Sequence, residues 1–401
     1  MLSVKNKLQE QQQNENKHIV ENTADTNRNS NSNNEKKEEK DLTTKTKKDL
    51  NPDLCVFGIG DYQFISLLGK GKFSEVMLAQ HYLTGEKFAI KIIDKRSYDE
   101  RILIRLIREI RIMEVLNHPN IVRIYETIET AYTIYMVMEY ISGGNLEEYL
   151  KKKGGYLNEQ EARAIFRQMI SAIDYCHRKW VVHRDIKAQN VLLTENNQIR
   201  IVDFGLSNRF GYNRLQTVCG SVFYYSPEMI NRKKYIGPEI DCWCLGIFLY
   251  RMTAGTEAFA NARSEEELRR DIVNRNYNTP DYFSEGLKHT IQKCLSTDRR
   301  RRSSLCNALQ GDPWLNDYGR LGDLFTDASN YHAAIQKERE QQQQQFLRDI
   351  EEEKRTVFQI RKNIIYHAYN KSNYYYTLHG KRDDSMTLES ARSKLYQDIR
   401  S

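Results

Sequence analysis

Two short polar motifs enclosed by apolar residues restrict this chain more than any other feature of its sequence. The first, His-Arg-Asp-Ile-Lys-Ala-Gln-Asn at residues 183–190, lies between valine- and leucine-rich segments. The second, Asp-Phe-Gly at 203–205, begins thirteen residues after Asn190 and follows a predicted strand. Asn190 and Asp203 supply oxygen ligands of the kind that Mg²⁺ accepts together with phosphate oxygens. Asp185 is then free to accept a hydroxyl proton, and Lys187 to stabilise a transferred group.

A glycine pair lies between the first two of three predicted strands, which cover residues 64–68, 76–79 and 87–93. A dinucleotide site needs a helix after its glycines, and the Gly-x4-Gly-Lys-Ser/Thr loop of other nucleotide-binding proteins is absent. A strand–glycine–strand flap lets backbone N–H groups approach phosphates, because Gly69 and Gly71 carry no Cβ. Taken alone, this motif is equally compatible with an ordinary hairpin.

Lys91 lies in the third predicted strand, between Ile90 and Ile92. A lysine within an apolar strand is costly unless its ammonium group is paired. Residues 99–116 predict an amphipathic helix, and Glu109 lies on its inner side. An ion pair between Lys91 and Glu109 that also holds phosphate oxygens explains both residues.

The order of predicted elements indicates a two-lobed α+β fold. Two further strands end at Met138, and helical patterns follow at 145–153, 158–179, 239–254, 264–275 and 284–295. A small β-rich N-terminal lobe thus precedes a larger helical lobe, and the two together form one domain over residues 62–315.

Two polar extensions flank this domain. Residues 1–55 contain few aliphatic residues and no aromatic one, so we expect a disordered tail. The extension 316–401 contains a helical pattern at about 332–368, with apolar residues at intervals of about three, four or seven: Phe346, Ile350, Val357, Ile360 and Ile364. This stripe predicts packing on the domain or on a second chain, or else a solvated helix.

Composition restricts the compartment and the partners. The seven cysteines are odd in number and scattered, which indicates reduced thiols in a cytoplasmic protein, with the nucleus as an alternative. We find no secretory signal, and the longest apolar run, at 242–250, is about half the roughly 20 residues of a membrane span. A net charge of +7 over 401 residues gives no case for nucleic acid. We therefore expect neither a membrane nor a nucleic-acid partner.

With these motifs in this order, residues 62–314 resemble a eukaryotic protein kinase. Ser226-Pro227-Glu228 stands where the family has Ala-Pro-Glu, and Arg302 matches the arginine that pairs with that glutamate. Lys187 is typical of serine/threonine kinases. Further phrases, at 136–140 and 215–221, are most similar to the calmodulin-dependent/AMP-activated (SNF1-like) group.

The resemblance implies ATP and Mg²⁺ as cofactors, and it assigns a role to each matching position. The nucleotide-binding residues are Leu68, Gly69, Lys70, Gly71, Lys72, Phe73, Ser74, Val76, Ala89, Lys91, Met138, Glu139, Ile141 and Leu192. The catalytic residues are Lys91, Glu109, Asp185 and Lys187, and the metal ligands are Asn190 and Asp203. Met113, Ile124, His183 and Phe204 form the spine that holds Glu109 inward.

Regulation and specificity are also implied by the resemblance. Phosphorylated Thr217 would pair with Arg184 and Arg105, which implies an upstream activating kinase in addition to protein substrates. Relatives that select arginine in their substrates carry carboxylates at the positions of Asn145, Gln189 and Arg251, so we expect no selection for arginine here.

Two departures from the family pattern leave the chemistry intact. Ser74 replaces the third glycine of the flap, and Ala188 replaces a loop proline. Because all the reactive groups are present, we predict an active serine/threonine kinase, with a catalytically inactive signalling scaffold as the alternative. A small-molecule kinase lacks support, because the Ser-Pro-Glu anchor is a feature of kinases that act on proteins.

Overall fold

The structure, a computed structural model, describes residues 58–71, 74–210 and 214–325. In the C-terminal extension it describes residues 348, 351–352, 355–360 and 362–363, all of them helical. The expected tail 1–55, Lys72 and Phe73 of the flap, and Phe346, Ile350 and Ile364 of the stripe lie outside the described residues.

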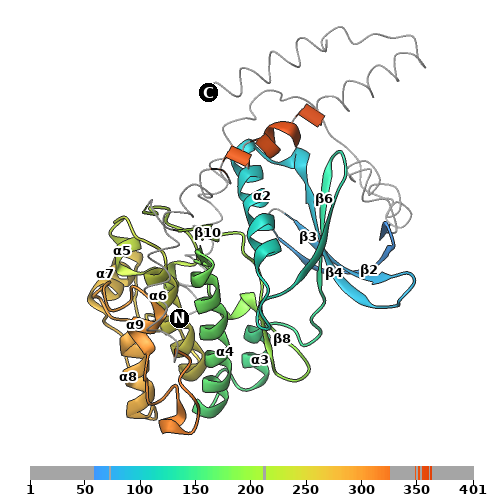
Figure 1. Cartoon of the computed structure of the whole chain (residues 1–401). Coiled ribbons are helices and arrows are strands. Elements are labelled where there is room, and N and C mark those ends of the chain that lie inside the picture. The colour runs from blue at the N-terminus through green and yellow to red at the C-terminus, as the bar shows by residue number, and fades with distance from the viewer. Residues whose placement is uncertain are drawn as a thin grey trace, which may run out of the picture.

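The N-terminal lobe is a six-stranded antiparallel sheet with the strand order β1-β2-β3-β4-β6-β5 (Figure 1). Its strands are β1 (Gly58–Ile59), β2 (Tyr62–Lys70), β3 (Glu75–His81), β4 (Lys87–Asp94), β5 (Ile124–Glu129) and β6 (Thr133–Glu139). Gly85, with φ of 70°, closes the turn from β3 to β4. One face of the sheet is covered by an apolar cluster that includes Phe88, Tyr135 and Val137.

The helix α2 (Glu100–Val115) belongs to this lobe (Figure 1). It begins after Asp99, whose carboxylate accepts a hydrogen bond from the backbone N–H of Ile102 and so caps the first turn. Its residues Leu106 and Met113 share one apolar cluster with Met136 of β6. The helix is therefore fixed by burial against the sheet.

The C-terminal lobe is helical (Figure 1). It contains α3 (Leu146–Lys152), α4 (Glu159–Arg178), α5 (Pro227–Ile230), α6 (Pro238–Ala254), α7 (Glu265–Asn274), α8 (Glu285–Cys294) and α9 (Leu305–Leu309). All of these except α6 begin with an Asn or Ser side chain that accepts a backbone N–H. Helix α6 is buried along almost its whole length, so it forms the centre of this lobe.

Short strands and 3₁₀ turns complete the two lobes, and several of them flank the polar motifs. They are the strands β7 (Val181–Val182), β8 (Val191–Leu193), β9 (Ile199–Ile201) and β10 (Asn208–Arg209), and the 3₁₀ turns η3 (Lys95–Ser97), η4 (Ala188–Asn190), η5 (Val222–Tyr224) and η6 (Asp317–Gly319). β8 pairs with β9, and β7 pairs with β10. These two pairings bring residues 183–190 and 203–205 side by side.

The two-lobed α+β fold is confirmed, and the predicted strands and helices agree with the structure to within a few residues. The short helices α5 and α9 were not predicted, because four- and five-residue segments show no recognisable helical period. Within the described ranges, no helix is long and apolar enough to cross a bilayer.

Candidate active site

Lys91 and Glu109 form the ion pair that the sequence predicts. Lys91 Nζ on β4 lies 2.5 Å from Glu109 Oε1 on α2, and both side chains are largely buried. Burial alone would lower the pKa of Lys91, but the charges of Glu109 and Asp203 outweigh it and hold the pKa above its ordinary value. The lysine is therefore a fixed positive charge between two carboxylates from different parts of the chain.

Gly205 connects this pair with the Asp-Phe-Gly motif. A Cβ atom added to Gly205 would lie 3.1 Å from Asp203 Oδ1 and 3.4 Å from Glu109 Oε2. The carboxylates of Asp203 and Glu109 thus approach the same glycine from two sides. Phe204 packs edge-on against His183, with ring centroids 4.8 Å apart, and Met113 is buried in the same cluster. Ile124 packs against that same large cluster, so of the predicted spine residues His183 and Phe204 are in direct contact and Met113 and Ile124 belong to or pack against the surrounding core.

Asp185 lies at the centre of the catalytic loop. Its Oδ2 atom is 2.7 Å from Lys187 Nζ and accepts a hydrogen bond of 2.9 Å from Asn190 Nδ2. Asn190 Nδ2 also donates to the backbone carbonyl of Asp185. The three side chains that the sequence singles out in this loop are therefore in direct contact around one carboxylate.

Asp241, at the start of α6, holds the backbone of this loop, and sequence reasoning missed this role. Its Oδ2 accepts from His183 N at 2.9 Å and its Oδ1 from Arg184 N at 2.8 Å, while His177 Nε2 lies 2.8 Å from Oδ2. Burial raises the pKa of Asp241, but the hydrogen bond and charge of His177, with the backbone N–H groups, outweigh it and keep the pKa low. A carboxylate immediately before an apolar run was the available signal.

The donor set of Asn190 and Asp203 fits a hard divalent cation. Because the amide nitrogen of Asn190 donates to Asp185, its amide oxygen points in the other direction. Asp203 is exposed, and Val202 N donates to the carbonyl of Asn190 at 2.9 Å, so the two ligands lie in neighbouring segments, Asn190 at the end of η4 and Asp203 shortly after β9. Two oxygen ligands leave room for phosphate oxygens, and the described residues contain no group of three or more acidic, histidine or cysteine ligands.

The predicted nucleotide-binding positions that the structure describes lie on or beside the strands of the N-terminal lobe, except Leu192. Leu68, Gly69 and Lys70 end β2, Ser74 and Val76 begin the returning strand, and Val76 pairs with Lys91 across β3 and β4. Ala89 pairs with Met138 of β6, and Glu139 and Ile141 continue from this strand into the connection between the lobes. Leu192 lies in β8 of the other lobe and is partly buried. The Glu139 carboxylate itself binds Arg200, 2.9 Å from Nε.

The segment between Asp203 and α5 lies against the catalytic loop. A Cβ atom at Gly220 would lie 3.1 Å from the carbonyl oxygen of Arg184 and 3.5 Å from Asp185 Oδ1. The segment is anchored by Glu228, which binds Arg302 at 2.9 and 3.1 Å in a fully buried pair. This is the pair between Glu228 of the Ser-Pro-Glu motif and Arg302 that the family resemblance implies.

Thr217 is exposed on the same segment. Its backbone carbonyl accepts from the Tyr235 hydroxyl at 2.6 Å, and Arg184 Nη1 lies 3.3 Å from that hydroxyl. Burial raises the pKa of Cys219, two residues further on, while the charges of Arg184 and Arg105 act in the opposite direction. Arg184 therefore reaches the Thr217 backbone through a single hydroxyl, and the charges of both predicted phosphate-binding arginines act on Cys219.

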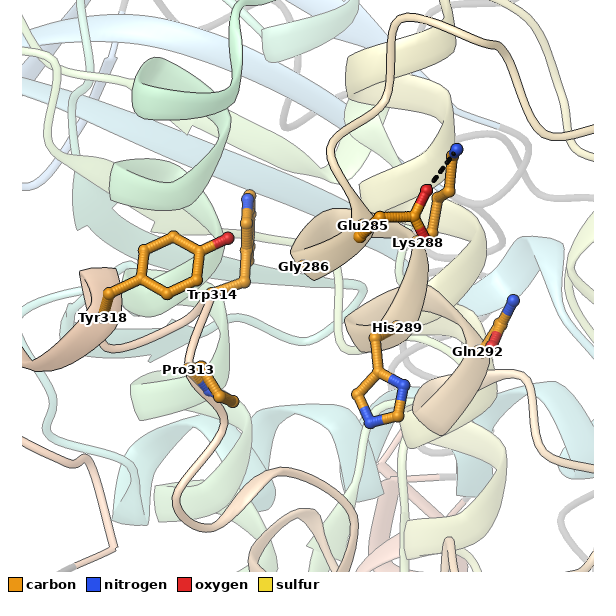
Figure 2. A pocket seen from close by; sticks show the side chains of 8 residues that line it. All are labelled: Glu285, Gly286, Lys288, His289, Gln292, Pro313, Trp314 and Tyr318. Atoms are coloured by element: carbon orange, nitrogen blue, oxygen red, sulfur yellow. Dashed lines mark hydrogen bonds and ion pairs between the residues drawn. The ribbon is translucent and has the colours of Figure 1, made fainter.

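A surface cavity of about 450 Å³ lies elsewhere, between α8 and the turn that leads to η6 (Figure 2). Figure 2 shows the lining residues on two sides, with His289 and Gln292 on α8 and Pro313, Trp314 and Tyr318 on the turn. The residues that line this cavity include none of the residues described above, so the cavity is separate from the predicted site.

The similarity of the chain to known proteins shows its family. Residues 62–315 match the family model described as "Protein kinase domain". The chain belongs to the protein kinase family. This kinase is 40% identical over 285 residues to the probable serine/threonine-protein kinase MARK-A of Dictyostelium discoideum. The aligned residues make up 70% of this chain and 27% of MARK-A.

It is also 39% identical over 258 residues to the SNF-related serine/threonine-protein kinases of Homo sapiens and Rattus norvegicus, covering 64% of this chain and 34% of each relative. These relatives support the resemblance to the SNF1-like group. The alignments span between about a quarter and a third of the relatives' own lengths.

Proposed function

We propose that this kinase transfers the γ-phosphoryl group of ATP to serine or threonine hydroxyls of protein substrates. The observation that carries the proposal is that Lys91 pairs with Glu109 beside Asp203, while Asn190 donates to Asp185. The hydrogen bond from Val202 N to the Asn190 carbonyl joins these two groups of side chains. In the transfer, the hydroxyl oxygen forms a bond to the γ-phosphorus and the bond to the ADP oxygen breaks. Asp185 accepts the proton that the hydroxyl loses, and ADP leaves.

Each residue has a part that follows from its contacts. Lys91, kept charged by its two carboxylate neighbours, binds phosphate oxygens, and Lys187 beside Asp185 offsets charge on the transferred group. Asn190 and Asp203 would hold Mg²⁺, which when bound neutralises the charge of the phosphates. Asn190 also orients Asp185 through its amide hydrogen bond, so the proton acceptor is fixed before substrate arrives.

The decisive experiment replaces Asp185 by asparagine. The amide keeps the shape of the side chain and removes its ability to accept the proton, so we expect turnover with a serine peptide to fall about 10²- to 10⁴-fold. Asp298→Asn, the same change at an exposed carboxylate, should leave turnover unchanged. Equal and negligible phosphate transfer by the wild type and by Asp185→Asn would favour the inactive signalling scaffold instead.

We further propose that phosphorylation of Thr217 by an upstream kinase activates the enzyme. A phosphate of charge near −2 placed on exposed Thr217 would attract Arg184, which reaches the Thr217 carbonyl through the Tyr235 hydroxyl, and Arg105 of α2. Because Arg105 precedes Glu109 by one helical turn on α2, that pairing couples the order of the segment to the Lys91–Glu109 pair. Full activity of Thr217→Ala protein purified from cells would contradict this switch.

We propose, thirdly, that the substrate groove does not select arginine. Asn145 and Gln189 are neutral, and Arg251 is buried. Its Nη2 donates to Glu147 Oε1 at 2.9 Å, and its Nη1 donates to the carbonyl of Gly155 at 3.0 Å. The loss of paired carboxylates, rather than repulsion by Arg251, is therefore the basis of the proposal.

A positional peptide library tests this selectivity, and strong selection for arginine two or three residues upstream would overturn it. Gln189→Glu is the informative variant, because Gln189 is exposed and the change adds one carboxylate without altering packing. We expect it to raise the preference for arginine.

A cytoplasmic location, with the nucleus as the alternative, stays a prediction from the cysteine pattern.

A further inference from the structure

Residues of the C-terminal extension are buried against the N-terminal lobe. Val357 and Ile360, one helical turn apart, are 1% and 2% exposed and belong to the same apolar cluster as Leu106 and Met113 of α2. Phe358, between them in sequence, is 40% exposed. The extension thus presents one apolar edge to the kinase domain, and Figure 1 shows this segment beside α2.

A polar contact fixes the position of the segment on α2. Arg111 Nη2 donates to Thr356 Oγ1 at 2.8 Å and lies 3.3 Å from Glu352 Oε1. Glu352 and Thr356 are four residues apart and lie on one helix face, joined by a hydrogen bond from Thr356 Oγ1 to the carbonyl of Glu352. A single guanidinium on α2 therefore binds two consecutive turns of the extension.

The two contacts of α2 lie on opposite sides of the helix. Successive residues of an α-helix are separated by about 100° of rotation, so Arg111 points about 160° away from Glu109, two positions earlier. Glu109 faces Lys91 in the cleft, and Arg111 faces the extension. α2 is consequently held between Lys91 on one side and the extension residues Glu352 and Thr356 on the other.

We propose that Glu352 and residues 355–360 are a clamp for α2, and that Arg111, Val357 and Ile360 are positioning residues for phosphoryl transfer. The proposal rests on the proposed kinase function. α2 carries Glu109, so the clamp favours the arrangement in which Glu109 binds Lys91 and Lys91 is ready for phosphate. If the clamp is released, α2 can leave this arrangement, and the fraction of competent enzyme falls.

The test uses the full chain with Val357→Ala and Ile360→Ala combined. We expect KM for ATP to rise and kcat to fall, together lowering kcat/KM roughly tenfold, because the apparent affinity is reduced by the fraction of competent enzyme. Amide hydrogen exchange should become faster in α2 and remain unchanged in α6. Phe358→Ala, which shortens an exposed side chain of the same segment, is the matched control and should behave as the wild type.

A charge exchange provides a second, independent test. Arg111→Glu places a carboxylate opposite Glu352 and should lower kcat/KM in the same way, whereas adding Glu352→Arg should restore much of the loss. Faster exchange in α2 with unchanged kinetic constants would overturn the positioning role, and unchanged exchange in α2 would overturn the clamp itself. A wild-type chain without any phosphate transfer would instead refute the kinase function, and the exchange of α2 would still report on the clamp.

Discussion

At the scale of single residues, Lys91 is the group for which burial and charge oppose each other most directly. Burial lowers its pKa, and Glu109 and Asp203 raise it above 10.5, so its charge is lost only as the pH rises through that elevated value. Glu109→Gln removes one of the two raising charges and leaves the burial. We therefore expect the pKa of Lys91 to fall and the charge to be lost at a lower pH than in the wild type.

The pH dependence of kcat/KM for ATP checks this prediction. The alkaline limb of the Glu109→Gln profile should lie at lower pH than that of the wild type, on top of a general loss of activity. Glu114→Gln, the same change at an exposed position of α2, should keep the wild-type profile. Identical alkaline limbs for all three proteins would show that Glu109 does not control the charge of Lys91.

Most of the reactive residues could be identified from the sequence, because a charged or polar side chain among apolar residues is costly unless it has a partner. A lysine in an apolar strand and a carboxylate, lysine and amide in one loop need partners, and Lys91, Asp185 and Asn190 have them. The role of Asp241 could not be identified, since its partners are the backbone N–H groups of residues 183 and 184. Backbone donors are the same in every sequence, so no pattern marks them. The burial of Arg251 depends likewise on Glu147, more than one hundred residues away.

At the scale of elements, the buried pair of Glu228 and Arg302 joins α5 to the segment before α9. Arg302 Nε also donates to the carbonyl of Ser296, and its guanidinium lies 5.3 Å from the ring centre of Trp243. Arg302→Met keeps most of the volume but leaves the Glu228 carboxylate buried without its partner. We expect a loss of about 3–5 kcal/mol in the free energy of unfolding, the range for breaking one side of a buried ion pair.

Chemical denaturation followed by fluorescence measures this loss. Arg301→Met is the matched control, because the neighbouring Arg301 side chain is 78% exposed and its nearest carboxylate is 3.9 Å away, so its effect should stay within about 0.5 kcal/mol. Equal stabilities of the two variants would mean that the Glu228–Arg302 pair does not stabilise the fold. The periodicity of apolar residues predicted most of the helices and strands, whereas only the resemblance to the family predicted the contact between Glu228 and Arg302.

At the scale of the whole molecule, the cleft combines groups from both lobes. Lys91 comes from the sheet, and Asn190 and Asp203 come from the loops of the helical lobe. A nucleotide with Mg²⁺ that bridges these groups binds only the folded chain and so stabilises it. At a concentration of one hundred times Kd, the expected stabilisation is about 2.7 kcal/mol. For a domain of this size, that corresponds to an increase in Tm of roughly 5–10 °C.

Thermal unfolding with ATP and MgCl₂, compared with ATP and EDTA, tests this bridging. The wild type should show the full increase in Tm only with Mg²⁺, and Asp203→Ala should show little increase under either condition, because one of the two metal ligands is missing. Asp298→Asn should retain the wild-type response. An equal increase with EDTA would indicate nucleotide binding without the metal, as in an inactive scaffold. No increase in the wild type would mean that the two lobes do not share a nucleotide.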